Sequence, residues 1–305
     1  MLELFVYLLI FVLTFLVSGN NLSVCTGTAY GSGIVTKKIA IILGITGYLS
    51  GFVLQGYNMA KGPGNLLYGL GNMVIVDILV VTIAIFIIAH FIKIPTSMVM
   101  VLTGSIFGIF FGINGRLPVQ SIINISLLWI TAPIVIIASS YIINVYLDSK
   151  YRSRSHNIWN IASFYKITIL ILTFFFAYAF GANTVGLIAA VSGNSITSKI
   201  IIGIALIFGP LLLSGGELKR ISSGLYLTKY SVGFITLLTS SVAVEISTFL
   251  GLPISNTQTI TSAMLGSAFG EKMRMIKIEG FLALIASWVI APFSGFVLSM
   301  VLVRI

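Results

Sequence analysis

The sequence predicts an all-α polytopic membrane protein with two inverted-topology repeats of about five membrane segments each, containing broken or re-entrant helices. Three observations lead to this prediction. Hydrophobic residues make up 58% of the 305 residues and charged residues only 8%, with a mean hydropathy of +1.11, which does not fit a water-soluble globule. Apolar runs close to membrane length recur along the chain. Finally, the plan of the first half returns in the second.

The apolar runs are separated by short polar or Gly- and Pro-containing stretches. In the first half they cover residues 4–17, 39–56, 73–92, 97–112 and 119–146. In the second half they cover residues 161–180, 200–214, 231–250, 255–269 and 280–303. Many approach the roughly 20 residues that a helix needs to cross the hydrocarbon core. No basic stretch precedes the first run, so we expect a retained membrane helix rather than a cleaved signal peptide.

Matching features place the second half about 160 residues after the first. The stretches KIPTSMVMVLTGSIFG (93–108) and GLPISNTQTITSAMLG (251–266) share Pro, Ser, Thr and Gly positions at an offset of 158. Further matched pairs are Trp129 with Trp288, Pro133 with Pro292, and Asn20 with Asn183. We therefore expect a first repeat over residues 1–146, a cytoplasmic linker over 147–160 and a second repeat over 161–305.

The charge distribution predicts the orientation of these repeats. An odd number of segments per half inverts the second repeat relative to the first. If the basic linker is cytoplasmic, thirteen of the 17 Lys and Arg residues lie inside, and only Lys61, Arg116, Lys199 and Arg304 lie outside. The positive-inside rule then places both termini outside a multi-pass cell membrane protein.

Several functional classes are not favoured. The net charge of +10 is spread over loops and helix ends without a nucleic-acid-binding motif. Cys25 is the only cysteine, which excludes an internal disulfide and offers no metal cluster. The chain has no His/Glu metal spacing, Walker loop or nucleophile elbow, so we expect neither an enzyme nor a cofactor.

Two matching polar interruptions of apolar runs predict a binding site. The stretch SGNN ends at Asn21 and the stretch GANT ends at Thr184, and we expect a helix break at each, followed by short segments over 22–35 and 185–197. In lipid, broken backbone persists only where protein or a watery cavity satisfies its polar groups. A short helix that starts inside the membrane presents free N–H groups and its positive dipole end, which suit an anion.

A second pair of breaks is expected at Pro95 and Pro253, because proline is favoured at helix starts. Each opens a short run rich in hydroxyl groups, which include Ser97, Ser255, Thr257, Thr259 and Thr261. Four helix starts, two from each half, would then meet near the midplane around one small oxyanion. The expected cradle consists of Asn20, Asn21, Asn183, Thr184, Ser97, Ser255 and Thr257, with no metal ligand.

These residues resemble the PiT family of inorganic phosphate transporters. The family signature Gly-Ala-Asn-Asp-Val-Ala-Asn is similar to GANTVGL (181–187) and SGNNLSV (18–24), and its motif Leu-Gly-Leu-Pro-Val-Ser-Thr-Thr-His is similar to LGLPISNTQ (250–258). The resemblance implies a permease that moves inorganic phosphate by alternating access. It also implies that the signature asparagines and the hydroxyls surround the anion.

The family's acidic residues are missing. Asn21 and Thr184 stand where the family has aspartate, and Gln258 stands where it has histidine. Those aspartates are expected to help bind a coupling cation, which leaves sodium or proton coupling open. A carboxylate can accept the O–H of hydrogen phosphate but only repels sulfate. A site made of donors alone therefore favours sulfate, and a sulfate permease of the same family is the alternative.

Glu245 lies inside an apolar run, where an ionisable group is a functional candidate. Burial favours its neutral form, which suits a proton-coupling carboxyl; a structural carboxylic acid is the alternative. An anion channel is a further alternative to the transporter, since it needs only a donor-lined pore. The expected partners are the oxyanion and the lipid bilayer, with no nucleic acid; a homo-oligomer remains open.

Overall fold

The computed structural model describes residues 1–67, 71–92, 96–152, 158–224, 230–271 and 278–304, and its regular elements are all helical over this part of the chain. The first half contains α1 (Leu2–Gly31), α2 (Lys37–Gln55), the 3₁₀ turns η1 (Gly56–Lys61) and η2 (Pro63–Leu67), α3 (Asn72–Phe91), α4 (Met98–Asn114) and α5 (Val119–Arg152). The second contains α6 (Ile158–Phe180), the π-helical turn η3 (Gly181–Val185), α7 (Gly186–Val191), α8 (Ile196–Gly224), α9 (Tyr230–Phe249), α10 (Asn256–Gly270) and α11 (Ile278–Arg304).

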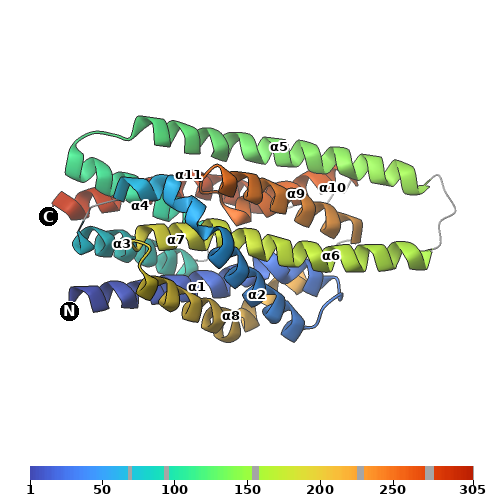
Figure 1. Cartoon of the computed structure of the whole chain (residues 1–305). Coiled ribbons are helices and arrows are strands. Elements are labelled where there is room, and N and C mark those ends of the chain that lie inside the picture. Colours follow the sequence, from blue (N-terminus) through green and yellow to red (C-terminus); the bar gives the residue numbers. More distant parts are fainter. Residues whose placement is uncertain (68–70, 93–95, 153–157, 225–229, 272–277, 305) are drawn as a thin grey trace.

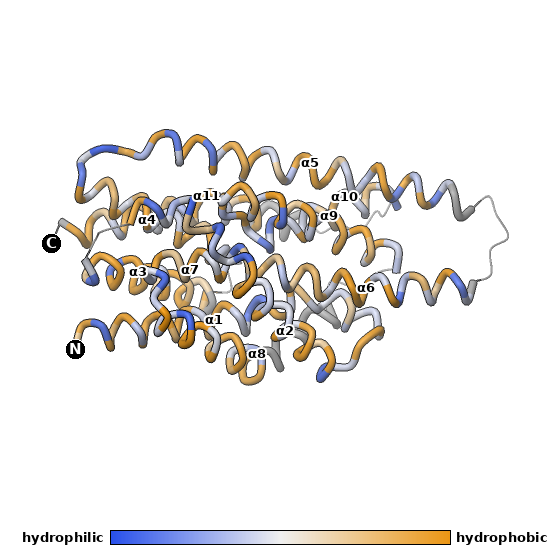
Figure 2. The backbone as a smooth tube through the Cα atoms, in the orientation of Figure 1, coloured by the Kyte–Doolittle hydropathy of each residue, from blue (hydrophilic) through white to orange (hydrophobic). Residues whose placement is uncertain are grey.

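Eight helical segments in the described part are long and apolar enough to cross a membrane. Two helices are shorter: α4 has 17 residues and α10 has 15. At 1.5 Å per residue they reach about 25 Å and about 22 Å, less than the roughly 30 Å of a hydrocarbon core. Hydrophobic residues run along most of each long helix (Figure 2). The prediction of an all-helical, polytopic membrane protein with short segments in each half is confirmed.

The helices form one elongated bundle (Figure 1). Both chain termini lie at the same end of this bundle. The last residues of α5 and the first residues of α6 lie at the opposite end. This arrangement agrees with five segments in each half. Which end faces the cytoplasm stays a prediction from the charge distribution.

The helix contacts are reciprocal between the two halves. Helix α1 packs on α8, and its counterpart α6 packs on α2. In the same way, α4 packs on α11 and α10 packs on α5. Exchanging each helix for its counterpart in the other half reproduces these pairs, which is the pattern expected of inverted repeats. Each short helix is therefore held mainly by the last long helix of the opposite half.

Glycines allow the closest of these crossings. A Cβ atom on Gly51 of α2 would collide with the carbonyl oxygen of Tyr178 on α6, and one on Gly181 would collide with the carbonyl oxygen of Tyr48. Between α4 and α11, a Cβ atom on Gly104 would collide with the carbonyl oxygen of Pro292. Small residues at such crossings let helix backbones approach and gain packing energy within a membrane.

The breaks expected at Asn21 and Thr184 are wrong. Helix α1 continues through Asn21 to Gly31, because the Asn21 amide nitrogen donates back to the carbonyl oxygen of Val17 at 3.0 Å and fits the helix. Thr184 lies in the π-helical turn, which widens the helix without ending it.

The chain changes direction about ten residues after each polar stretch, and not at the stretch itself. Gly33 and Gly193 both adopt a left-handed conformation, with φ of 72° and 76°, which glycine accepts at no steric cost. The segments expected over 22–35 and 185–197 are therefore not separate helices. The first is mostly the last part of α1, and the second contains α7 and the start of α8.

Candidate functional site

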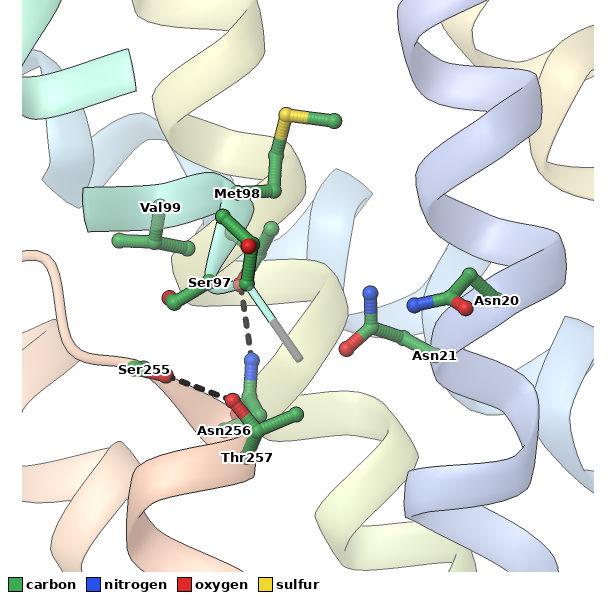
Figure 3. A pocket seen from close by; sticks show the side chains of 10 residues that line it. Asn20, Asn21, Ser97, Met98, Val99, Ser255, Asn256 and Thr257 are labelled. Atoms are coloured by element: carbon green, nitrogen blue, oxygen red, sulfur yellow. Dashed lines mark hydrogen bonds between the residues drawn. The ribbon is translucent and has the colours of Figure 1, made fainter. Parts of the chain in front are cut away.

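A polar pocket lies where the short helices α4 and α10 begin (Figure 3). Its walls come from α1, from η3 and from the first residues of both short helices. The lining residues are Asn20, Asn21, Thr96, Ser97, Met98, Val99, Thr184, Ser255, Asn256 and Thr257. The space between these residues is about 270 Å³, open solvent at its mouth included. The enclosed part is smaller than that, so it suits a small ion better than a larger metabolite.

Ser97 and Ser255 occupy equivalent positions as the N-caps of α4 and α10. Their backbone angles are nearly the same, with φ of −86° and ψ of 112° for Ser97 and φ of −82° and ψ of 118° for Ser255. The first N–H groups of a helix have no partner within it, and the positive end of the helix dipole lies at the same place. Two helix starts from opposite halves thus present donors and positive potential to one pocket, as predicted for Pro95 and Pro253; Pro95 itself lies outside the described residues.

Hydroxyl groups surround the start of α10. The Ser255 Oγ atom accepts a hydrogen bond from the backbone N–H of Gln258 at 3.3 Å and lies 2.9 Å from the Thr257 Oγ1 atom. In contrast, the Thr259 hydroxyl donates to the carbonyl oxygen of Asn256, and the Thr261 hydroxyl donates to that of Thr257. These last two hydroxyls donate to backbone carbonyl oxygens of α10, and neither residue is among those that line the pocket.

The opposite wall comes from α1 and η3. Asn20 and Asn21 both point from α1 toward the pocket (Figure 3). Thr184 is almost fully buried, and its Oγ1 atom accepts a hydrogen bond from the Asn256 amide nitrogen at 2.8 Å. This bond ties η3 directly to the first residue of α10. Asn256 also lines the pocket, although it is not one of the predicted cradle residues.

Asn183 does not line the pocket but lies beside it, fully buried. Its side-chain nitrogen donates to the carbonyl oxygen of Leu252 and to the Thr248 hydroxyl, each at 3.1 Å. Its side-chain oxygen accepts from the backbone N–H of Ile254, also at 3.1 Å. These three bonds fix the turn that leads into α10. Six of the seven expected cradle residues thus meet in one pocket, and the seventh holds one wall in place.

Trp129 of α5 also fixes the start of α10. Pro133 lies inside α5 and has no N–H to donate to the carbonyl oxygen four residues earlier. That carbonyl belongs to Trp129, and it accepts a hydrogen bond from the Gln258 side-chain nitrogen at 3.1 Å. The Trp129 indole N–H donates in return to the carbonyl oxygen of Pro253 at 2.9 Å. The repeated Trp-x-x-x-Pro pattern was the signal in the sequence that could have identified this clamp.

None of the described residues that line the pocket carries a charge, so the pocket favours an anion through neutral donors and helix dipoles. Glu245 lies outside it on α9, one helical turn before Thr248. Its Oε2 atom is buried and has no hydrogen-bond partner in the described part of the chain, and the same holds for the Gln55 amide nitrogen. These two side chains lie close to each other. The expected proton-coupling candidate is therefore a partly buried carboxyl beside the site.

Comparisons with known proteins agree with this architecture. The sequence matches the phosphate transporter family over residues 17–184 and 176–305. It is 28% identical to a candidate phosphate permease of Methanocaldococcus jannaschii, over 96% of this chain and 94% of the relative. It is 26% identical to the sulfate permease CysP of Bacillus subtilis, over 95% of this chain and 84% of the relative.

A solved structure shares the fold. It is described as the sodium-dependent phosphate transporter, and it superimposes with a TM-score of 0.81 over 99% of this chain and 98% of its own. The sequence identity is 15%, so this likeness concerns the fold alone.

Proposed function

Because this chain belongs to the phosphate transporter family, we propose that it is a secondary active transporter that carries inorganic phosphate across the membrane by alternating access. The observation that carries this proposal is the pocket between the starts of α4 and α10. It lies between two inverted halves, which is where secondary transporters hold their substrate.

The cradle offers the phosphate ion neutral donors on several sides. Ser97, Ser255, Thr257 and Thr184 contribute hydroxyl groups, and Asn20 and Asn21 contribute amides. Backbone N–H groups at the helix starts add charge-assisted hydrogen bonds to the anion. Asn183 acts through the turn before α10 and is a positioning residue.

Alternating access is supported by the reciprocal packing of the short helices. Each short helix is packed mainly against the opposite half, so α4 moves with α11 and α10 moves with α5. Rocking of these units would open the pocket first to one side of the membrane and then to the other. The repeat boundaries at 146 and 161 and the placement of both termini outside the cell membrane are part of this proposal.

For the coupling ion, we propose a proton that is bound by Glu245. The partly buried carboxyl of Glu245 lies one turn from Thr248, which accepts a hydrogen bond from Asn183, and this place on α9 supports the role. The named structural neighbour is sodium-dependent, so sodium is the other candidate. The proposed transporter needs no cofactor besides the coupling cation.

Sulfate is the second candidate substrate. The full-length similarity to a sulfate permease favours it, and so does the lack of acidic residues among the described residues that line the pocket. An anionic side chain there would repel sulfate, which has no proton to donate to it.

Uptake into proteoliposomes tests the proposal. Purified protein would be reconstituted, and uptake of radiolabelled phosphate and sulfate would be measured with an imposed proton gradient, a sodium gradient or neither. We expect phosphate to accumulate above its outside concentration and an uncoupler to abolish this accumulation. Uptake that only equalises the two concentrations would indicate a channel instead, and no uptake of either anion would refute the proposal.

A further inference from the structure

The hydrogen bonds of the pocket determine which polar atoms are left for a ligand. The amide nitrogen of Asn256 donates to the Thr184 hydroxyl, and that of Asn21 donates to the Val17 carbonyl oxygen. An amide oxygen can only accept hydrogen bonds. Each nitrogen thus gives one of its two N–H groups to a protein partner, and each side chain also has an oxygen that can only accept.

The acceptor of Asn256 is the more informative of the two. The residue is 3% exposed and lines the pocket. Its Oδ1 atom is buried and has no donor partner in the described part of the chain. A buried acceptor without a donor costs about 1–3 kcal/mol. Its presence in a pocket suited to an anion points to a ligand that brings its own hydrogen.

The neighbouring hydroxyls are biased in the opposite sense. Ser255 Oγ already accepts from the Gln258 N–H and is paired with Thr257. Whichever of these two hydroxyls donates to the other, one O–H group remains for the anion. Thr184 Oγ1 accepts from Asn256, which leaves its O–H group as a donor. The pocket thus combines hydroxyl donors with amide acceptors.

We propose that the pocket binds an oxyanion in a protonated form, and that the Asn256 side-chain oxygen accepts the hydrogen of its P–O–H group. The Asn21 oxygen is the second acceptor. This inference rests on the proposed function and makes it more specific. Hydrogen phosphate and hydrogen arsenate carry such a hydrogen, whereas sulfate carries none and would set an anionic oxygen against the Asn256 acceptor.

The Asn256 side-chain oxygen changes the substrate that is expected from the absence of the family's aspartates. The missing carboxylates suggested a site of donors alone, which favours sulfate, although the family resemblance implied phosphate. An amide oxygen can accept the anion's hydrogen as a carboxylate does, but it carries no full charge that would repel the rest of the anion. The site can therefore distinguish phosphate from sulfate without an acidic residue.

Selectivity of uptake tests this assignment. Wild type, Asn256→Leu and Asn256→Asp would be reconstituted, with Asn124→Leu at an exposed position on α5 as the matched control. Inhibition of phosphate uptake by arsenate and by sulfate would be measured for each. We expect arsenate to inhibit wild type and the control far better than sulfate does. In Asn256→Leu the preference for arsenate over sulfate should fall about tenfold, which corresponds to the loss of one hydrogen bond to a charged ligand. Asn256→Asp should keep the preference.

Each other outcome overturns the inference. An unchanged preference in Asn256→Leu, or a preference for sulfate in Asn256→Asp, removes Asn256 as the acceptor. If Asn256→Leu does not fold, Asn256→Val, which also lacks an acceptor, takes its place, because an aspartate repels sulfate whether or not Asn256 is the acceptor. Wild type that takes up sulfate better than phosphate refutes this inference but leaves an oxyanion transporter. Wild type that takes up neither anion refutes the proposed function itself, and the inference with it.

Discussion

The backbone N–H of Ile254 donates a hydrogen bond to the side-chain oxygen of Asn183 at 3.1 Å, across 71 positions of the sequence. The bond joins the π-helical turn η3 to the segment that leads into α10. Because α10 and its N-cap residue Ser255 together supply three pocket residues, the shape of the pocket depends on a residue that does not line it.

We expect Asn183→Leu to reduce phosphate uptake at least about tenfold and to lower stability. The substitution leaves the buried N–H of Ile254 without an acceptor, which costs about 1–3 kcal/mol. The carbonyl oxygen of Leu252 keeps a second donor, the Ser247 hydroxyl. The measurements are uptake into proteoliposomes and thermal unfolding in detergent. Asn114→Leu, at an exposed position near the end of α4, is the control, and normal uptake by Asn183→Leu would contradict the positioning role.

The sequence was sufficient to predict the class of fold and the starts of the two short helices. Helix starts were expected at Pro95 and Pro253, and α4 and α10 begin a few residues after these positions, each directly after a serine. Proline and serine act on their own local backbone, so their effect can be read without knowledge of distant neighbours.

The predictions failed where a side chain had a choice of partners. Asn21 was expected to end a helix, but its amide bonds to a carbonyl oxygen one turn earlier and the helix continues. The roles of Asn256 and Gln258 were not predicted because their partners, Thr184 and Trp129, lie 72 and 129 positions away. Such contacts depend on how the two halves pack, which a single sequence does not specify.

The clamp between α5 and α10 predicts coupled effects of two substitutions. Trp129→Phe removes the donor to the Pro253 carbonyl oxygen, and Gln258→Leu removes the donor to the Trp129 carbonyl oxygen. We expect each to cost about 0.5–1.5 kcal/mol of stability and to raise the KM of uptake. The double variant should lose less than the sum, because both bonds hold the same helix start.

Thermal unfolding and uptake kinetics of the four proteins complete this double-mutant cycle. Trp159→Phe is the control for the loss of an indole, since Trp159 is 81% exposed. Strictly additive losses of stability would show that the two bonds act independently and that α5 does not clamp α10.

Opposite effects are expected from the same substitution at two glycines. In Gly51→Ala the new methyl group would collide with the carbonyl oxygen of Tyr178, and forcing α2 from α6 should cost about 1–3 kcal/mol. In Gly203→Ala the nearest atom, Cδ2 of Leu49, lies 4.0 Å away. Alanine should therefore stabilise α8 by about 0.5–1 kcal/mol through its helix preference. Thermal unfolding in detergent measures both, and equal shifts would contradict the close crossing of α2 and α6.

Proton coupling through Glu245 predicts that Glu245→Gln separates uptake from the proton gradient. Glutamine keeps the size of the side chain but cannot take up or release a proton, so the variant should fold and bind phosphate. An inward proton gradient should stimulate uptake by wild type and by Glu3→Gln, which changes an exposed carboxyl at the start of α1. It should not stimulate uptake by Glu245→Gln, because the variant has no group one turn before Thr248 that could change its charge. If Glu245→Gln keeps the full response to the gradient, Glu245 is a structural carboxylic acid and the coupling ion binds elsewhere.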